Sequence, residues 1–426
     1  MAFGTAGEGS ITVVQAAKKN YTIPLILMVS LYFGIGFITA LNDILVPHFK
    51  DLFHLTNVTA LLVQFCFFGA YFVMSLPSGW IVGRIGYKRG IVVALSIMGL
   101  GLLLFLPASI IIFYPLFLFA LFVVGSGLAL LQVAINPYVG ALGTPETAAS
   151  RLNLAGGFNS FATTIAPKIG AAFIFIAAGA SAAQLARSVR VPYLLLAICA
   201  FAMAIVTAFV QLPDVIEQGR MKSASEGSAW KFPHLRFGAL AIFFYVGAEV
   251  AIGSIMISFL GQPSMGGLSH EAAARYVSLY WGGAMVGRFI GFAALREIRA
   301  QRALAFVSLT ASLLVILAIA AHGHIAMWAI VSCGLFNSVM WPCIFPLSVQ
   351  GLGRFTSQGS GILIMMVVGG AVIPEVQGFL ADRFGYQPSF TIVLLCYLYI
   401  LFFALRGHRI RNVVEATGSL GPGVIQ

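Results

Sequence analysis

Charged side chains are scarce in this sequence. Asp, Glu, Lys and Arg make up only 9% of its 426 residues, whereas 60% are hydrophobic. A soluble globular domain carries about 25% charged residues, so this composition excludes a soluble protein. It is typical of a chain that crosses a lipid bilayer repeatedly as α-helices.

Signals of catalysis and of metal or nucleotide binding are also missing. The five cysteines lie in apolar runs without CxxC or Cys/His ligand spacing, so we expect small core residues. The GGFN sequence at 156–159 is neither a GxGxxG motif nor a P-loop, and no strand precedes it. No nucleophile, base or metal-ligand set converges at a membrane interface. We therefore expect no enzyme, no cofactor, no bound metal and no ATP-driven pump.

A net charge of +11 would suggest a nucleic-acid partner in a soluble protein. Here the basic residues gather in short gaps between apolar runs, as the positive-inside rule predicts for cytoplasmic loops. We therefore expect no nucleic-acid binding. The first 20 residues are small and polar with late lysines (Lys18 and Lys19), so we expect no cleavable signal peptide.

Apolar segments long enough to cross a bilayer, about 20 residues each, number twelve. They cover 22–47, 57–82, 90–108, 112–138, 151–178, 190–212, 235–260, 271–295, 301–321, 324–349, 358–380 and 386–406. Lys and Arg concentrate at the N-terminus and in alternate loops, which predicts that both termini are cytoplasmic. The sequence thus predicts an all-α, multi-pass protein of the plasma (inner) membrane.

The longest polar segment divides the chain into two sets of six segments. We expect a cytoplasmic tail, a six-helix bundle, a cytoplasmic linker, a second six-helix bundle and a cytoplasmic tail at 1–21, 22–212, 213–234, 235–407 and 408–426. An internal repeat supports this division, because TTIAPKIGAAF and GGAVIPEVQGF align Pro167 with Pro374. Pseudo-symmetric halves with a binding site between them near the midplane are typical of secondary transporters.

Amide side chains occur where hydrocarbon is expected on the fourth and fifth segments. Gln132 and Asn136 are four residues apart, as are Asn159 and Thr163, so each pair shares one helix face. Two neighbouring helices that turn amides inward form a neutral hydrogen-bonding surface. Such a surface suits a polyhydroxylated solute better than an ion or a lipid.

Other spans add candidate substrate contacts. Asn337 and Trp341 share a face of the tenth segment, where the amide would bond hydroxyls and the indole would stack on a sugar C–H face. Trp341 has packing as its alternative. Asn42 and Gln64 are further candidates for the cavity, and Arg288 is expected to brace the cytoplasmic end of its helix.

Two carboxylates lie at membrane depth, Asp43 in the first segment and Glu249 in the middle of the seventh. A carboxylate there is costly unless it faces water, a partner or an ion, so we predict that both handle a coupling cation. The alternatives are that Asp43 caps a helix end before Pro47 and that Glu249 makes a structural hydrogen bond.

Lys168 and Glu375 directly follow the repeat prolines, in the outer halves of their helices. We predict that they form part of a gate, by pairing with each other or by Lys168 pairing with Asp43 when the outer side closes. The alternative is that each extends to the membrane interface. A fixed cation near Asp43 would compete with Na⁺ and favour a proton-linked or uncoupled mechanism.

The sequence GWIVGRIGYKRG at 79–90 resembles the loop signature of the major facilitators, although alone it could be an ordinary positive-inside loop. Five further stretches are similar to the fucose permease and glucose/galactose transporter family over nearly the whole chain. They are LNDILVPHF, NPYVGALGTPETAASRLNLAGGFNS, YVGAEVAIGS, GLFNSVMWPCIFPLSVQGLG and TSQGSGILI.

This resemblance implies two six-helix bundles in a major facilitator fold, and a monosaccharide carried with H⁺ or Na⁺. It implies that Asp43 takes the coupling cation and that Asn159 contacts the sugar. Two positions depart from the fucose-permease pattern: Gln132 replaces a protonatable glutamate, as in the glucose/galactose branch, and Gly156 replaces a sugar-binding glutamine.

We therefore expect a monomeric secondary transporter in the lipid bilayer. It would import a hexose such as glucose, galactose, mannose or fucose, or an amino sugar, by cation-coupled symport with alternating access. The alternatives are an uncoupled sugar facilitator and a non-transporting sugar sensor on the same fold.

Overall fold

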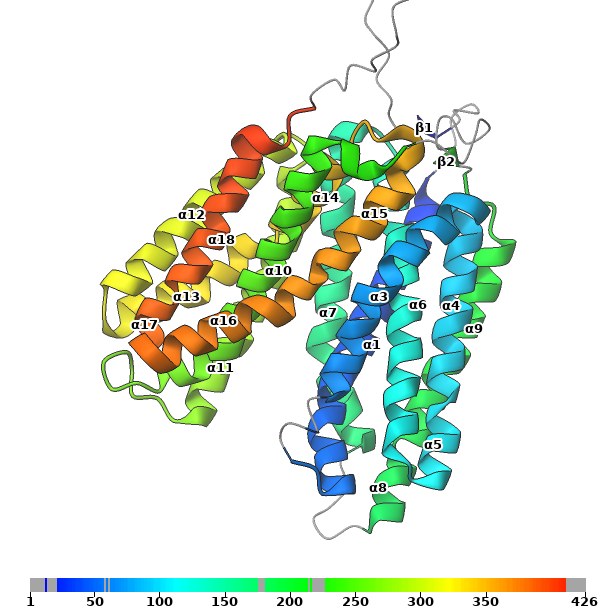
Figure 1. The fold of residues 1–426 in the computed structure, drawn as a ribbon, viewed down its shortest axis with the longest axis horizontal. Coiled ribbons are helices and arrows are strands. Elements are labelled where there is room, and N and C mark those ends of the chain that lie inside the picture. Colours follow the sequence, from blue (N-terminus) through cyan, green and yellow to red (C-terminus); the bar gives the residue numbers. More distant parts are fainter. Residues whose placement is uncertain are drawn as a thin grey trace, which may run out of the picture.

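The computed structural model describes residues 12–13, 21–56, 59, 62–174, 181–213, 215–216 and 227–410. The first half of the chain forms the helices of the N half: α1 (Thr22–Phe53), α3 (Leu62–Ile85), α4 (Tyr87–Leu103), α5 (Phe105–Ile111), α6 (Tyr114–Ala141), α7 (Ala148–Ile174), α8 (Ala182–Ser188) and α9 (Arg190–Phe209). Figure 1 shows them on one side of the molecule.

The second half of the chain forms the C half on the other side (Figure 1). Its helices are α10 (Pro233–Leu260), α11 (His270–Ala294), α12 (Ala300–Ala320), α13 (Gly323–Asn337), α14 (Met340–Val349), α15 (Thr356–Met365), α16 (Gly369–Phe384), α17 (Tyr386–Ser389) and α18 (Thr391–Phe402). Short 3-10 turns occur at Pro145–Thr147, Ala229–Lys231, Gly353–Phe355 and Met366–Val368, and Phe403–Gly407 is a π-helical turn. β1 (Thr12–Val13) and β2 (Val215–Ile216) form one small antiparallel pair.

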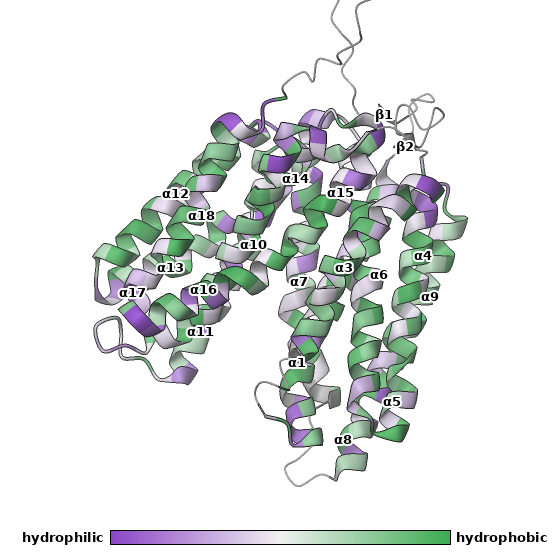
Figure 2. Ribbon diagram, in the orientation of Figure 1, coloured by the Kyte–Doolittle hydropathy of each residue, from purple (hydrophilic) through white to green (hydrophobic). Residues whose placement is uncertain are grey.

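Within the described residues, ten helical segments are long and apolar enough to span a bilayer. Two more, α7 and α11, have 27 and 25 residues but carry more polar side chains. The expected all-α membrane architecture is therefore confirmed, and these two helices complete twelve long segments in the described chain. Large hydrophobic side chains such as Phe65, Phe209 and Phe306 are exposed, as lipid contact requires. Hydrophobic stretches run along the helices of both halves (Figure 2).

Several boundaries differ from those expected. The first helix continues past 47 to Phe53 and ends where His54 takes a left-handed conformation (φ 50°). Pro115 lies in the first turn of α6, where its missing N–H costs nothing. The tenth span is interrupted between Asn337 and Met340, and the eleventh by the turn at Met366–Val368. Residues 175–178, expected at the end of the fifth helix, lie outside the described chain.

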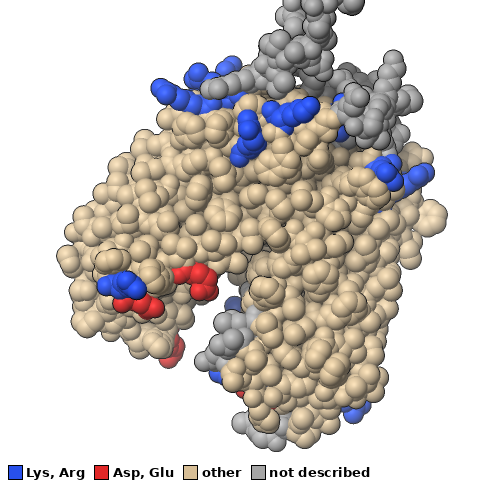
Figure 3. Space-filling model, in the orientation of Figure 1, with Lys and Arg blue, Asp and Glu red and all other residues tan. Residues whose placement is uncertain are grey.

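The two halves meet mainly through two pairs of helices, α7 with α11 and α3 with α15. We call these the α7–α11 seam and the α3–α15 seam. Lys and Arg gather at one end of the molecule, which we call the basic end (Figure 3). At the opposite end, the open end, the space-filling view is hollowed between the halves. The molecule is therefore closed at its basic end and open at the other.

Candidate functional site

Two of the predicted amides converge on a single residue of α1, Tyr32. Its phenol donates a hydrogen bond to Asn136 Oδ1, and its backbone carbonyl accepts one from Asn159 Nδ2 at 2.9 Å. One turn later, a Cβ on Gly36 would overlap the backbone carbonyl of Asn159, so glycine permits α1 and α7 to touch. The polarity pattern identified both amides but not the tyrosine between them.

The remaining amides of the N half form two further pairs. Gln132 Nε2 donates to the Tyr71 hydroxyl at 2.9 Å, and Asn42 Nδ2 donates to Gln64 Oε1 at 3.1 Å. Asn42 Oδ1 is buried and has no hydrogen-bond partner among the described residues. Three predicted amides, on α1, α3 and α6, thus form these pairs, and Asn42 Oδ1 keeps acceptor capacity for a ligand.

Asn337 lies at the centre of a buried tyrosine network in the C half. Its Nδ2 donates to the Tyr280 hydroxyl at 2.9 Å, and its Oδ1 accepts from the Tyr397 hydroxyl at 2.7 Å. Tyr280 in turn donates to the backbone carbonyl of Glu249 at 3.0 Å. Asn337 is fully buried, so it acts on its surroundings through these two phenols.

Trp341 is half-buried and belongs to an aromatic group. Its ring stacks on Phe345 at a centroid distance of 6.1 Å and lies 6.3 Å from Tyr245. A turn at Ser338 and Val339 separates α13 from α14, and both residues keep right-handed helical backbone angles. Through Tyr245, Trp341 lies near Glu249.

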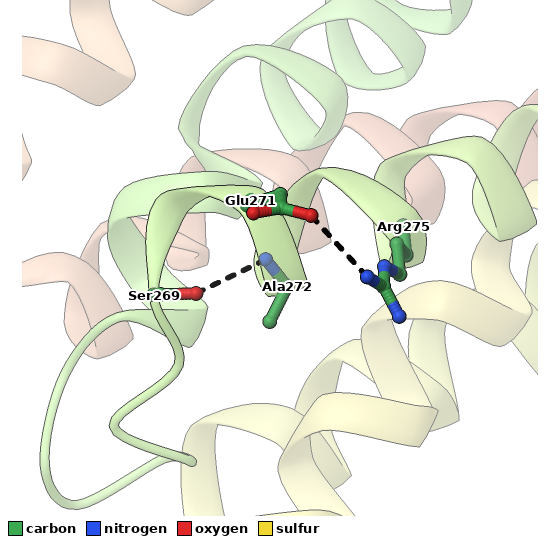
Figure 4. Close-up of polar contacts among 4 residues, drawn as sticks. All are labelled: Ser269, Glu271, Ala272 and Arg275. Carbon is green, nitrogen blue, oxygen red and sulfur yellow. Dashed lines mark hydrogen bonds and ion pairs between the residues drawn. The ribbon is translucent and has the colours of Figure 1, made fainter.

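Glu249 is only 9% exposed, in the middle of α10. Its carboxylate interacts with the Tyr245 phenol and with the charge of Arg288, while Oε1 has no hydrogen-bond partner among the described residues. In the part of the chain that the structure describes, the one ion pair within 4.0 Å joins Glu271 to Arg275 (Figure 4). Glu249 and Arg288 are therefore neighbours without direct contact.

Arg288 makes a contact between the two halves whose partner the sequence did not reveal. Its Nη1 donates to the backbone carbonyl of Gly156 at 2.9 Å, so it ties the C half to the N half. Its charge also acts on Tyr32 and Tyr245. An arginine inside an otherwise apolar run was the available signal, since such residues line cavities or contact partners.

The two seams close the basic end through small residues and neutral hydrogen bonds. Ser150 Oγ donates to the Phe292 carbonyl at 2.6 Å across the α7–α11 seam. Ser360 Oγ, on α15, donates to the Val133 carbonyl on α6 at 2.9 Å. In the α3–α15 seam, a Cβ on Gly361 would lie 2.6 Å from the Ser75 carbonyl. The halves thus touch backbone to backbone.

A cavity of about 1050 Å³ lies between the halves at the basic end. We call it the basic-end cavity. Asn136 lines it, and the buried Nδ2 of this residue has no hydrogen-bond partner among the described residues. Tyr21 and His408, near the two described ends of the chain, line the same cavity, so both ends lie on one side of the molecule.

The structure leaves the predicted cation and gating residues in different situations. Asp43 lies on α1, but its side chain is outside the described part of the chain. Lys168 on α7 and Glu375 on α16 are both exposed and form no ion pair with each other. Lys168 lies on a helix of the α7–α11 seam, whereas α16 is part of neither seam.

Comparison with known proteins identifies the family to which this fold belongs. The Major Facilitator Superfamily model matches residues 28–374, so the chain belongs to the Major Facilitator Superfamily. The chain is 52% identical to a "Glucose/galactose transporter" of Brucella abortus, over 92% of this chain and 96% of that protein. It is 33% identical to the "L-fucose-proton symporter" of Escherichia coli, over 91% of this chain and 93% of that protein.

A solved structure agrees with both the fold and the open hollow. The crystal structure of the Major Facilitator Superfamily transporter FucP in the outward conformation superposes with a TM-score of 0.83 and 32% identity, covering 91% of this chain and 99% of that one. The resemblance first seen in the motifs is confirmed. The protein is a multi-pass membrane transporter of this superfamily and not an enzyme.

Proposed function

We propose that this protein imports a monosaccharide by symport with a cation, and that the monosaccharide is a hexose such as glucose or galactose or a related amino sugar. The names of the 52% and 33% identical relatives support this choice. We also propose that the basic end faces the cytoplasm of an inner membrane, following the positive-inside rule. The structure then represents the outward-open state.

The main support for this proposal is a set of three buried polar atoms that have no hydrogen-bond partner in the described part of the chain. Asn42 Oδ1, Asn136 Nδ2 and Glu249 Oε1 are buried without partners among the described residues. Each such atom costs about 1–3 kcal/mol if it stays unpaired. Hydroxyl groups both donate and accept, so a sugar that moves along this path can pair with the acceptor, the donor and the carboxylate in turn. Direct contacts are assigned to Asn136, Asn159 and Gln132, while Asn337 orients its two tyrosines and Trp341 offers an apolar face.

Asp43 and Glu249 are proposed as the cation-handling groups, one in each half. The charge of Arg288 acts on Glu249. A fixed cation competes with Na⁺ for a nearby carboxylate, so this arrangement favours H⁺ as the coupling ion. Lys168 and Glu375 retain their proposed part in closing the outer side.

Uptake into proteoliposomes tests the proposal, with labelled glucose, galactose, mannose, fucose and an amino sugar offered under separate pH and Na⁺ gradients. We expect accumulation driven by the pH gradient. In Glu249→Gln and in Asp43→Asn, accumulation should be lost while exchange of labelled for unlabelled sugar continues.

The alternatives give different results in the same assay. Flux without gradient dependence would mean an uncoupled facilitator, and sugar binding without flux would mean a sensor. Neither binding nor flux for any sugar offered would refute the sugar proposal. If accumulation were unchanged in both variants, neither carboxylate would take part in cation coupling.

A further inference from the structure

Tyr32 holds amides on two different helices of the N half. Its phenol holds Asn136 of α6 and its backbone carbonyl holds Asn159 of α7. Tyr32 is buried, with only 8% of the residue exposed. A single residue of α1 therefore orients both amides to which the proposed function assigns sugar contacts.

These two bonds differ in kind. The bond to Asn159 uses the backbone of Tyr32 and is reinforced by the contact of α1 with α7 at Gly36. It survives any substitution that keeps the helix. The bond to Asn136 depends on the phenol hydroxyl alone. Removing that hydroxyl therefore separates the two contacts experimentally.

Asn136 also lines the basic-end cavity, and its buried Nδ2 has no hydrogen-bond partner among the described residues. Asn159 does not line this cavity. Tyr32 is not among the lining residues, and the charge of Arg288 acts on its phenol. Arg288 closes the α7–α11 seam at Gly156. The bond between Tyr32 and Asn136 thus joins a buried residue of α1 to a residue at the wall of the basic-end cavity.

We propose that Tyr32 is a positioning residue that links sugar binding to the inner barrier. Its carbonyl holds Asn159 in place for the sugar, and its phenol closes the barrier by holding Asn136. When that bond opens, the amino group of Asn136 is the first donor that the sugar meets on its way into the cytoplasmic cavity. The inference rests on the proposed function for the identity of the solute.

Tyr32→Phe is the test, because it removes the hydroxyl and keeps both the ring and the backbone. We expect the KM for external sugar to stay within about twofold of the wild-type value. Loss of one buried hydrogen bond should raise the inward-open population about fivefold, so accumulation in a gradient should fall while sugar exchange continues. Asn136→Ala should lower accumulation in the same way and, because Asn136 contacts the sugar, should also raise the KM; combining the two should add little to the loss of accumulation.

Tyr138→Phe is the matched control. Tyr138 is buried on α6, and its hydroxyl donates to the Pro213 carbonyl at 3.0 Å, away from the polar centre. It should accumulate sugar as the wild type does. If Tyr32→Phe raised the KM more than about tenfold with a normal accumulation ratio, the phenol would belong to the sugar site instead. A normal KM together with normal accumulation would show that the Tyr32 phenol has no role in the inner barrier.

A second measurement does not need sugar. Spin labels on cysteines replacing the exposed Arg89 and Arg302, on the cytoplasmic side of the two halves, report inner opening. Cys66 and Cys199, which are not fully buried, are changed to Ser in this background. We expect Tyr32→Phe to increase the long-distance population. An unchanged distribution would overturn the barrier role, even if the wild type carried no sugar and the proposed function failed.

Discussion

Gly361→Ala should shift the transporter from the outward-open to the inward-open state. A Cβ at this position would lie 2.6 Å from the Ser75 carbonyl in the α3–α15 seam, and a backbone carbonyl cannot rotate away. The contact exists where the halves meet at the basic end, so the added methyl penalises that closed state. When the inner side opens, the seam separates and the penalty disappears.

The size of the shift follows from the cost of overpacking, about 1–3 kcal/mol. Since about 1.4 kcal/mol changes an equilibrium tenfold, the ratio of inward-open to outward-open molecules should rise by about 5- to 150-fold. The spin labels at positions 89 and 302 measure this ratio directly. Uptake at limiting external sugar should fall in parallel, because fewer molecules present the outward-open site.

Two glycines serve as controls on the same pair of spans. A Cβ at Gly378 of α16 or at Gly69 of α3 would meet nothing within 4 Å. Gly378→Ala and Gly69→Ala should therefore leave the distance distribution unchanged. If Gly361→Ala shifted the distribution no more than these controls, the seam would not hold the inner side closed and the reasoning would fail.

Other substitutions test packing and the outer side. In Gly238→Ala, the added methyl would clash with Ser348 inside the C half. The cost of about 1–3 kcal/mol should lower the melting temperature of the purified protein by several degrees. The distances between the spin labels should not change. A shift in those distances would contradict this. Lys168 and Glu375 are both exposed, and Lys168→Glu or Glu375→Lys alone should reduce uptake because like charges would meet as the outer side closes. The charge-swapped double variant should restore uptake, and failure of this rescue would refute the pairing.

Much of the fold could be predicted from the sequence, because composition and segment length alone determine what lipid allows. Membrane helices and their order followed directly. Helix breaks were less accessible: the sequence predicted one helix over 324–349, whereas the structure interrupts it between Asn337 and Met340. No hydropathy pattern reports such a break.

The sequence predicted individual polar residues of the site but not the hydrogen bonds that join them. Spacing identified Asn136 and Asn159 as polar residues facing inward, which is a property of single helices. Their common partner, Tyr32, contributes a backbone carbonyl and a phenol. A tyrosine in an apolar run resembles any other aromatic residue of the core, so only the packing of α1 against α6 and α7 reveals it.

Arg288 shows the same limit. Sequence position suggested a brace at the end of a helix, and the hydrogen bond to Gly156 provides one. Its action on Glu249, Tyr245 and Tyr32 depends on three helices meeting at one point. Such a meeting is a property of the tertiary structure.

Counterflow in proteoliposomes tests the central claim most directly, because it needs neither a gradient nor a known coupling ion. Vesicles containing purified wild-type protein are loaded with unlabelled glucose or galactose and diluted into a trace of the labelled sugar. We predict a transient accumulation of label that protein-free vesicles do not show. If folded protein gave no such overshoot with any hexose or amino sugar, the hollow between the halves would not be a sugar pathway.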